Sequence, residues 1–310
     1  MKILLCDTVV HPTPILKGWY LGLADLGLTP KFLPIPQYNL FQIQDEFDVI
    51  VYPVIEPKHL PEFEDYKKRF PKTKIIGCRD EWVSSNLKFK DLVDFFVIPL
   101  DSTPSVVKEY KKNGFKAYNI PLAGNKHLFF KSDIAEYYDA CFIGTLGHGY
   151  RKEDKYLYPI LDKYNNSFLG GMVYRKFQHG FIPYELANGY RNSSKINLNF
   201  HYDYQIKGKG LSSDIGNKKL DRNDINQSVF NIALTGRFQL CDHPSVIDAF
   251  KNNIVVANED NWMETFEYYL HNQKERFELA HKAMLIAQKE HTWEVRMLQF
   301  LKILEKHYEK

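Results

Sequence analysis

Polar and charged side chains follow two short apolar runs in the second half of the chain. Asp242 and His243 come directly after the run 238–241, and an acidic turn, 258–260, comes directly after the run 254–257. Helical patterns separate these runs, which is typical of a parallel sheet with right-handed crossovers. Ligands bind such sheets at the carboxyl ends of the strands. We therefore expect Asp242 and His243 to lie at a binding site.

A second candidate site is the glycine-bearing turn after the strand-like run 138–143. Gly144 and Thr145 begin this turn, and a helical pattern starts just after Arg151. Main-chain N–H groups at the positive end of a helix suit a diphosphate. The spacing does not match GxGxxG, so an ordinary glycine turn is the alternative.

The elements that position these residues form two α/β domains. At 310 residues the chain exceeds the usual size of one compact domain. Strand-like runs alternate with helical patterns through residues 1–124, and the segment Ala-Gly-Asn at 123–125 is the expected linker. The second domain repeats the alternation and contains a long polar segment, 202–224, of the kind that is functional or disordered in compact domains.

The composition restricts the class of protein. A net charge of +3 and a pI near 8.4 are far from the strongly basic footprint of a general nucleic-acid binder. Cys6, Cys78, Cys141 and Cys241 lie in apolar runs without a C-x-x-C pair, which predicts buried, reduced thiols. The chain starts with a strand-like run rather than a signal peptide, and no apolar run approaches the roughly 20 residues of a membrane span. We expect a soluble, cytoplasmic protein with no transmembrane segment, whose membrane association would be peripheral.

The order of short motifs in the second half matches a known pattern. The matching segments are Ser-Lys-Ile-Asn (194–197), Phe-Asn with Ala before Gly (230–236), Asp242, Phe250, Tyr-Tyr-Leu (268–270), Arg276, His-Thr (291–292) and Arg296. From about 139 to 296 the chain resembles the C-terminal domain of GT-B glycosyltransferases, most closely the spore-maturation-protein-like glycosyltransferases. The resemblance implies an α/β fold with two Rossmann-like domains facing a central cleft. These would be an acceptor domain (1–124), a nucleotide-sugar donor domain (125–292) and a last helix (293–310) that returns to the first domain.

The resemblance also implies an activity: transfer of a sugar from a nucleotide-sugar donor to a glycan, a lipid-linked acceptor or another hydroxyl, without a metal or cofactor. Positive groups must then balance the leaving diphosphate. Arg151 is the first candidate because a guanidinium binds phosphate oxygens in two-pronged fashion, and Arg237 and Lys195 follow. Arg151 could instead be a solvated arginine at the start of a helix, and Lys195 could instead be a structural cation.

The strand-end residues take more specific roles under the same resemblance. Asp242 could bind sugar hydroxyls, and His243 could contact a phosphate or a sugar hydroxyl; helix capping is the alternative for both. Metal binding is disfavoured because the histidines are scattered and the Asp242-His243 pair has no partner at ligand spacing.

Asn231 departs from the family pattern. It stands where the family usually has a glutamate, which in many GT-B enzymes accepts hydrogen bonds from the ribose hydroxyls. An amide can accept one such bond and donate another, whereas a carboxylate accepts two more strongly. Asn231 remains a donor-binding candidate, and the alternatives are a different donor or a non-catalytic GT-B-like protein that binds a nucleotide or glycan.

The base that deprotonates the acceptor should come from the first domain. Asp80, after the run 74–78, is the best candidate by position, His11 is the alternative and Glu81 is third. The layout of the first half also resembles phage DNA glucosyltransferases, in which an aspartate after the equivalent strand is the proposed base. A strand-end aspartate is more often a turn or cap residue.

A DNA base is the remaining alternative acceptor. The only basic segment that could form its groove contains Lys207, Lys209, Lys218 and Lys219. Its charge is offset by Asp214, Asp221 and Asp224. We therefore rank DNA below a glycan as the acceptor.

Overall fold

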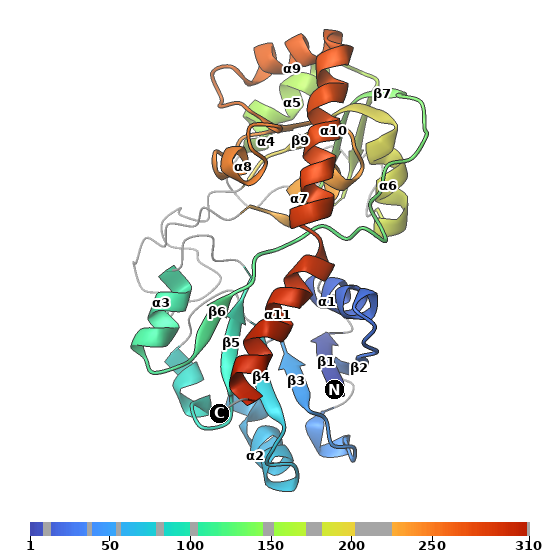
Figure 1. Cartoon of the computed structure of the whole chain (residues 1–310). Helices are drawn as coiled ribbons and strands as arrows, with labels where there is room; N and C mark the ends of the chain where they lie inside the picture. The colour runs from blue at the N-terminus through green and yellow to red at the C-terminus, as the bar shows by residue number, and fades with distance from the viewer. Residues whose placement is uncertain are drawn as a thin grey trace. The chain divides into compact units, whose positions relative to one another are not determined.

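The computed structural model describes residues 1–8, 14–35, 39–53, 57–78, 84–99, 105–144, 152–171, 182–201 and 225–308. They form two compact units. The first unit contains residues 1–122 and 293–308, and the second contains residues 123–201 and 225–292. Each unit is built on one parallel sheet with helices packed against it (Figure 1). The expected α/β class is confirmed.

A six-stranded parallel sheet, in the order β2-β1-β3-β4-β5-β6, forms the centre of the first unit. Its strands are β1 (Ile3–Thr8), β2 (Lys31–Ile35), β3 (Val49–Tyr52), β4 (Lys74–Cys78), β5 (Phe95–Ile98) and β6 (Ala117–Asn119). Short 3-10 helices span Leu40–Gln42, Pro57–His59 and Ser84–Phe89. Every residue of β3 and β5 is buried, as expected for parallel strands covered on both faces.

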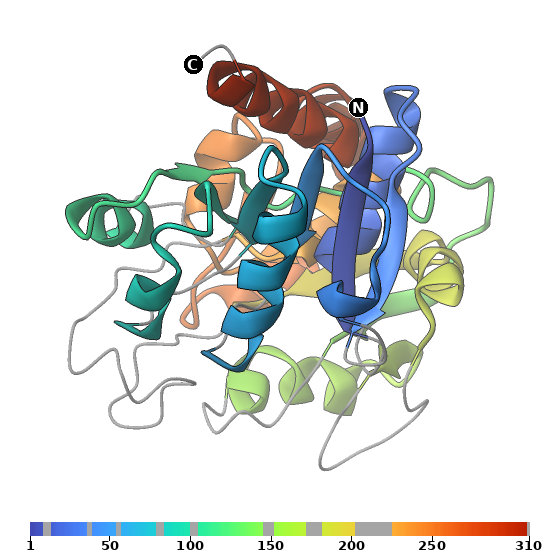
Figure 2. The same ribbon diagram turned by 90° about the horizontal axis from the view of Figure 1, so that it is seen from below.

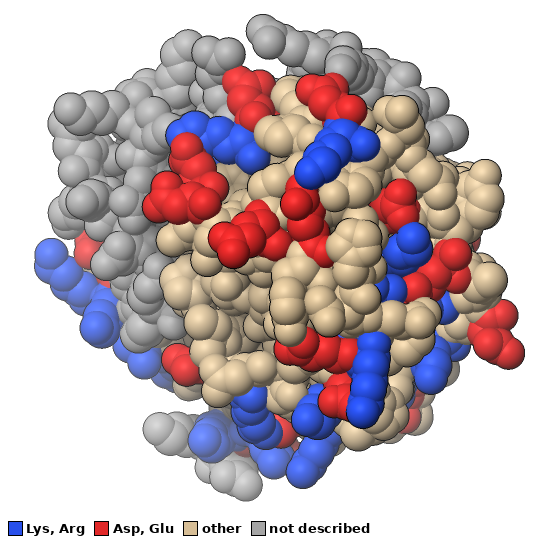
Figure 3. All heavy atoms as spheres, turned by 90° about the horizontal axis from the view of Figure 1, so that it is seen from above, with Lys and Arg blue, Asp and Glu red and all other residues tan. Residues whose placement is uncertain are grey.

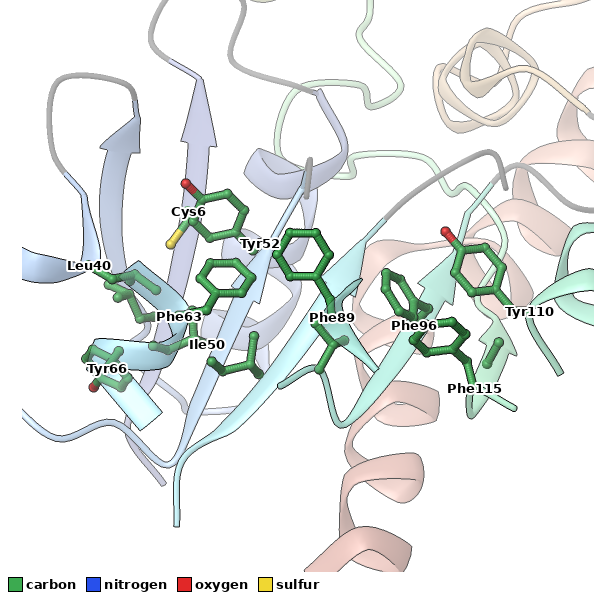
Figure 4. Packing of buried hydrophobic residues seen from close by; sticks show 14 of the residues in the cluster. Cys6, Leu40, Ile50, Tyr52, Phe63, Tyr66, Phe89, Phe96, Tyr110 and Phe115 are labelled. Carbon is green, nitrogen blue, oxygen red and sulfur yellow. The ribbon is translucent and has the colours of Figure 1, made fainter. Parts of the chain in front are cut away.

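Aromatic side chains fill the layer between this sheet and the helices α2 (Leu60–Arg69) and α3 (Ser105–Lys112). Phe63 of α2 lies between Tyr52 and Phe89, with ring centroids 5.0 and 5.8 Å apart (Figure 4). Buried aromatic side chains contribute large apolar areas, so this layer fixes both helices on one face of the sheet.

The last helix, α11 (Trp293–Tyr308), packs against α1 (Pro14–Asp25) within the first unit. A Cβ at Gly18 would lie 2.1 Å from Trp293 Nε1, and one at Gly22 would lie 2.6 Å from Trp293 O, so glycine permits the close approach. Figure 2 shows α11 along the face of the sheet opposite α2. The expected return of the last helix to the first domain is confirmed.

The second unit has a five-stranded parallel sheet in the order β11-β10-β9-β7-β8. Its strands are β7 (Tyr138–Ile143), β8 (Ser167–Gly170), β9 (Ser194–Asn199), β10 (Gln239–Cys241) and β11 (Val255–Val256). Its helices are α4 (Lys152–Tyr156), α5 (Tyr158–Lys163), α6 (Tyr184–Asn192), α7 (Gln227–Leu234), α8 (Ser245–Ala249), α9 (Trp262–His271) and α10 (Gln273–Glu290). The sequence pattern predicts one helix up to Tyr164. Two form instead, because Pro159 lacks an amide hydrogen and suits the first turn of a new helix.

The four cysteines are buried and free, which confirms the expectation of buried, unpaired thiols. Burial raises the pKa of Cys141 to about 12, so this thiol stays protonated at neutral pH. Within the described residues, no helix combines the length and apolar character needed to cross a membrane.

Candidate functional site

The carboxyl ends of β9 and β10 bring His201 and Asp242 together. The two strands are parallel and pair Asn199 with Cys241, so the residues just beyond them emerge side by side. Asp242 Oδ1 accepts a hydrogen bond from the main-chain N–H of His201 at 2.8 Å and lies 3.0 Å from His201 Nδ1. Both side chains are almost fully buried, 7% and 2% exposed. The site therefore has a fixed imidazole–carboxylate pair.

The hydrogen bonds of the His201 ring define its protonation. Its Nε2 accepts the main-chain N–H of Asn226 at 3.1 Å, so this nitrogen carries no proton. The ring proton of the neutral imidazole then lies on Nδ1 and is donated to Asp242. Asn226 also caps α7 by accepting from Val229 N at 3.2 Å, in keeping with the preference of asparagine for this position, and so connects the start of α7 to the site.

Lys152, the first residue of α4, completes this cluster. Its Nζ lies 2.9 Å from Asp242 Oδ2. Burial alone would raise the pKa of Asp242, but the hydrogen bond from His201 and the charge of Lys152 hold that pKa below its usual range. The ring of His243 lies 4.5 Å from the His201 ring, centroid to centroid. An ionised carboxylate thus positions an ammonium group at the carboxyl edge of the sheet.

Glycines line the same edge where β7 and β8 end. Gly171 has a φ of 112°, and a Cβ at this position would lie 1.9 Å from Gly144 O. Gly144 N donates to Gly170 O at 3.1 Å. The main chains of the two strand ends therefore meet without side chains between them, which leaves the backbone of Gly144 able to approach a ligand closely.

Two predicted phosphate ligands lie at the opposite, amino ends of the strands. Lys195, the second residue of β9, pairs with Asp139 at 2.6 Å. Arg237 precedes β10 and lies 3.4 Å from Glu136, which also pairs with Arg276 at 2.7 Å. These partners favour the structural alternative for Lys195 and give Arg237 a structural role as well.

The side chain of Asn231 is hydrogen-bonded to the main chain at the start of the second unit. It lies on α7, is 5% exposed, and its Oδ1 accepts the main-chain N–H of Asn125 at 3.0 Å. Asn125 Oδ1 in turn accepts from His127 N at 3.1 Å. The amide therefore has a structural partner, and its predicted contact with a nucleotide stays a prediction.

Five other candidates, His11, Asp80, Glu81, Thr145 and Arg151, lie outside the described residues. Their predicted roles stay predictions.

Residues 147–302, half of the chain, match the family model described as Glycosyl transferase-like. The matched range contains Lys152, His201 and Asp242. The chain belongs to this family of glycosyltransferases. No curated protein sequence matches it.

Three solved structures share the fold of this glycosyltransferase at low sequence identity. Anabaena HepE, in complex with UDP and glucose, has a TM-score of 0.60 and 10% identity over 99% of this chain and 100% of its own. Sucrose-phosphate synthase from Thermosynechococcus elongatus has a TM-score of 0.60 and 8% identity over 99% of each chain. AviGT4, a glycosyltransferase of avilamycin A biosynthesis, has a TM-score of 0.57 and 12% identity over 93% of this chain and 95% of its own. The likeness confirms the GT-B fold.

The strand-end cluster of this glycosyltransferase could also offer ligands to a metal ion. One ligand atom from each of His201, Cys241 and Asp242 lies within 4.8 Å of the others. The expectation that Asp242 has no such partner rested on spacing along the chain, and the fold brings His201 to it across 41 positions. A cation would have to displace the proton on His201 Nδ1 and the proton of the Cys241 thiol, whose pKa is raised by burial. It would also be repelled by the ammonium group of Lys152, which pairs with Asp242. The protein's own hydrogen bonds already satisfy these groups.

Lys152 and His201 are the site residues that sequence reasoning missed in this glycosyltransferase. His201 stands two residues beyond Asn199, where β9 ends, and Lys152 directly follows Arg151. Ligands bind at the carboxyl ends of parallel strands, and this argument, which points to Asp242, applies to His201 as well. No local signal reveals that Lys152 and Asp242, 90 positions apart, form an ion pair.

Proposed function

We propose that this enzyme transfers a sugar from a nucleotide-sugar donor to a hydroxyl acceptor, and that the donor binds at the carboxyl edge of the second sheet. The observation that carries the proposal is the Lys152–Asp242–His201 cluster at that edge. Support for the donor class comes from Anabaena HepE, which shares the fold and was determined with UDP and glucose. The closer resemblance to spore-maturation-protein-like enzymes stays a prediction.

In this proposal the chain supplies the charge that a metal would otherwise supply. The bond between the anomeric carbon and the diphosphate oxygen breaks, and the nucleoside diphosphate leaves with the electron pair. Lys152, held by Asp242, and the neighbouring Arg151 stabilise the negative charge that develops. The main chain at Gly144 can approach the phosphates closely. Reaction without a metal is part of the proposal.

In the same proposal, the acceptor binds to the first unit, which also supplies the base. The acceptor hydroxyl forms the new bond to the anomeric carbon and gives its proton to a base, for which Asp80 is the first candidate and His11 the second. We propose a glycan or lipid-linked acceptor and a cytoplasmic enzyme, a location in which four free thiols stay reduced.

The donor site is tested with a panel of nucleotide sugars, beginning with UDP-glucose. We expect a donor to raise the melting temperature of the native protein and to be turned over with release of the nucleoside diphosphate. Lys152→Met should weaken donor binding about 10- to 100-fold, since it removes a hydrogen bond from a charged group. Lys155→Met is the matched control, because Lys155 lies on the same short helix and pairs with Glu259 instead.

Two results would contradict this function. One is a native protein whose melting temperature responds to no nucleotide sugar. The other is a Lys152→Met variant that is folded by circular dichroism and binds donor as tightly as Lys155→Met.

A non-catalytic binding protein is the second candidate function, favoured by Asn231 at the family's glutamate position and by the structural partner of its amide. Donor binding without turnover, unchanged in Asp80→Ala, would support it. A DNA acceptor ranks lower. On the face in Figure 3 the lysines and arginines are interspersed with aspartates and glutamates rather than gathered in one basic track.

A further inference from the structure

We propose that one edge of the first unit docks on an anionic lipid surface. This basic edge lies at α3 and the neighbouring ends of β5 and β6, where β6 is the last strand of the sheet (Figure 1). It contains one exposed leucine and six exposed lysines: Leu87, Lys88, Lys90, Lys108, Lys111, Lys112 and Lys116. The proposal does not depend on the donor site of the second unit.

The turn at Gly114, between α3 and β6, is the centre of the basic edge. A Cβ at Gly114 would lie 2.7 Å from Lys90 Nζ, so the loop before β5 lies beside the end of α3. Lys116 O accepts the main-chain N–H of Phe96 at 2.9 Å, which places the starts of β5 and β6 next to each other. Lysines from three separate segments therefore share one small area.

On α3 the lysines occupy one face. Lys108, Lys111 and Lys112 are exposed at positions i, i+3 and i+4, while Val107 and Tyr110 are buried against the sheet. Like charges at this spacing destabilise a helix. The negative end of the helix dipole offsets the two lysines of the last turn, but it does not reach Lys108 or the lysines outside α3. The excess charge can be balanced by an external anion.

These lysines also lack carboxylate partners among the described residues. None of the six forms an ion pair with a residue that the structure describes, whereas Lys67 and Lys74 of the same unit both pair with Asp94, at 2.9 and 3.1 Å. The described carboxylates along these segments are Asp91, Asp94 and Glu109, and Asp94 already pairs with Lys67 and Lys74. Glu109 accepts a hydrogen bond from the Asn113 amide at 3.3 Å. Among the described residues of these segments, six lysines stand against three carboxylates, one of which is already paired with two other lysines, so positive charge is in excess.

The exposed leucine decides which anion fits best. Leu87 is 48% exposed and directly precedes Lys88. An exposed aliphatic side chain next to lysines suits a lipid surface, because the ammonium groups reach the head groups while the apolar side chain enters the interface. A single-stranded nucleic acid would instead favour aromatic side chains on which bases stack. Among the described residues of the basic edge, no exposed side chain is aromatic.

Co-sedimentation of the full chain with phosphatidylcholine vesicles, with and without phosphatidylglycerol, tests the proposal. We expect binding only to the anionic vesicles, decreasing as salt is raised. Each lysine near an anionic bilayer contributes about a fivefold factor, so Lys90→Gln/Lys108→Gln/Lys112→Gln should weaken partition about 100-fold. Leu87→Gln should weaken it further without changing the salt dependence.

A matched control removes the same charge elsewhere. Lys274, Lys282 and Lys289 are exposed on α10 of the second unit, and the triple glutamine variant should bind vesicles within about twofold of the native protein if only the basic edge faces the lipid. Equal losses in the two triple variants would overturn the proposal. So would equal binding to neutral and anionic vesicles, or tighter binding to a DNA duplex than to anionic vesicles. Donor turnover measured without vesicles reports on the proposed function separately.

Discussion

His201 Nδ1 lies 3.0 Å from Asp242 Oδ1, while His201 Nε2 accepts the main-chain N–H of Asn226 at 3.1 Å. The imidazole therefore connects the end of β10 to the start of α7, and its neutral form has its proton on Nδ1. Asp242 also pairs with the ammonium group of Lys152, so one carboxylate is the shared partner of Lys152 and the neutral His201. The geometry of the proposed donor site depends on this carboxylate.

Removal of the imidazole should destabilise the protein. We expect His201→Ala to lower the free energy of unfolding by about 2 to 3 kcal/mol, because a buried carboxylate oxygen and the N–H of Asn226 both lose a partner. His201→Asn, which keeps a donor near the Nδ1 position, should recover part of the loss. Urea denaturation measures both variants. A loss below about 0.5 kcal/mol in His201→Ala would show that these hydrogen bonds contribute little.

The lowered pKa of Asp242 predicts a dependence of stability on pH. Because the folded pKa lies below that of the unfolded chain, its contribution is present above about pH 4 and is lost as pH falls through the folded pKa. Asp242→Asn should therefore lose less stability than the native protein between about pH 5 and pH 2. Unfolding free energies across this range test the assignment. A constant difference between the two proteins would contradict it.

The raised pKa of Glu62 predicts the opposite dependence of stability on pH. Glu62 is 4% exposed, and burial raises its pKa although it accepts hydrogen bonds from Leu40 N at 2.9 Å and Tyr52 OH at 3.2 Å. A folded pKa above the unfolded value means that ionisation of Glu62 lowers stability as pH rises. The stability of Glu62→Gln relative to the native protein should therefore increase from about pH 4 to pH 7. Denaturation midpoints at several pH values measure this trend, and a flat or falling difference would disprove it.

The contact between α1 and α11 can be tested with one methyl group. Gly22→Ala would place a Cβ 2.6 Å from Trp293 O, and we expect it to lower the free energy of unfolding by about 1 to 3 kcal/mol. Gly189→Ala is the matched control. Gly189 lies inside α6 with no atom within 4 Å of an added Cβ, so the same change should stabilise the protein by about 0.5 to 1 kcal/mol. Equal effects of the two changes on thermal unfolding would contradict this packing.

Local signals in the sequence were sufficient for much of the second unit. Asn226 caps α7 as its residue type predicts, and Gly236 ends that helix with a φ of 65°. Asp242 stands at the end of β10 because the short apolar run before it forms a strand. Pro159 is a local signal for two helices rather than one, because proline suits the first turn of a new helix.

Local patterns along the chain predict the alternation of strands and helices, their caps and the polar residues at the strand ends, because these features depend on neighbours a few positions away. Which of these residues come into contact depends on how the whole chain folds. Lys152 and His201 reach Asp242 across 90 and 41 positions. The side chain of Asn231 accepts a hydrogen bond from the main chain of Asn125, 106 positions away. Such pairs follow from strand order and register, which are set by the packing of the whole sheet rather than by any short segment.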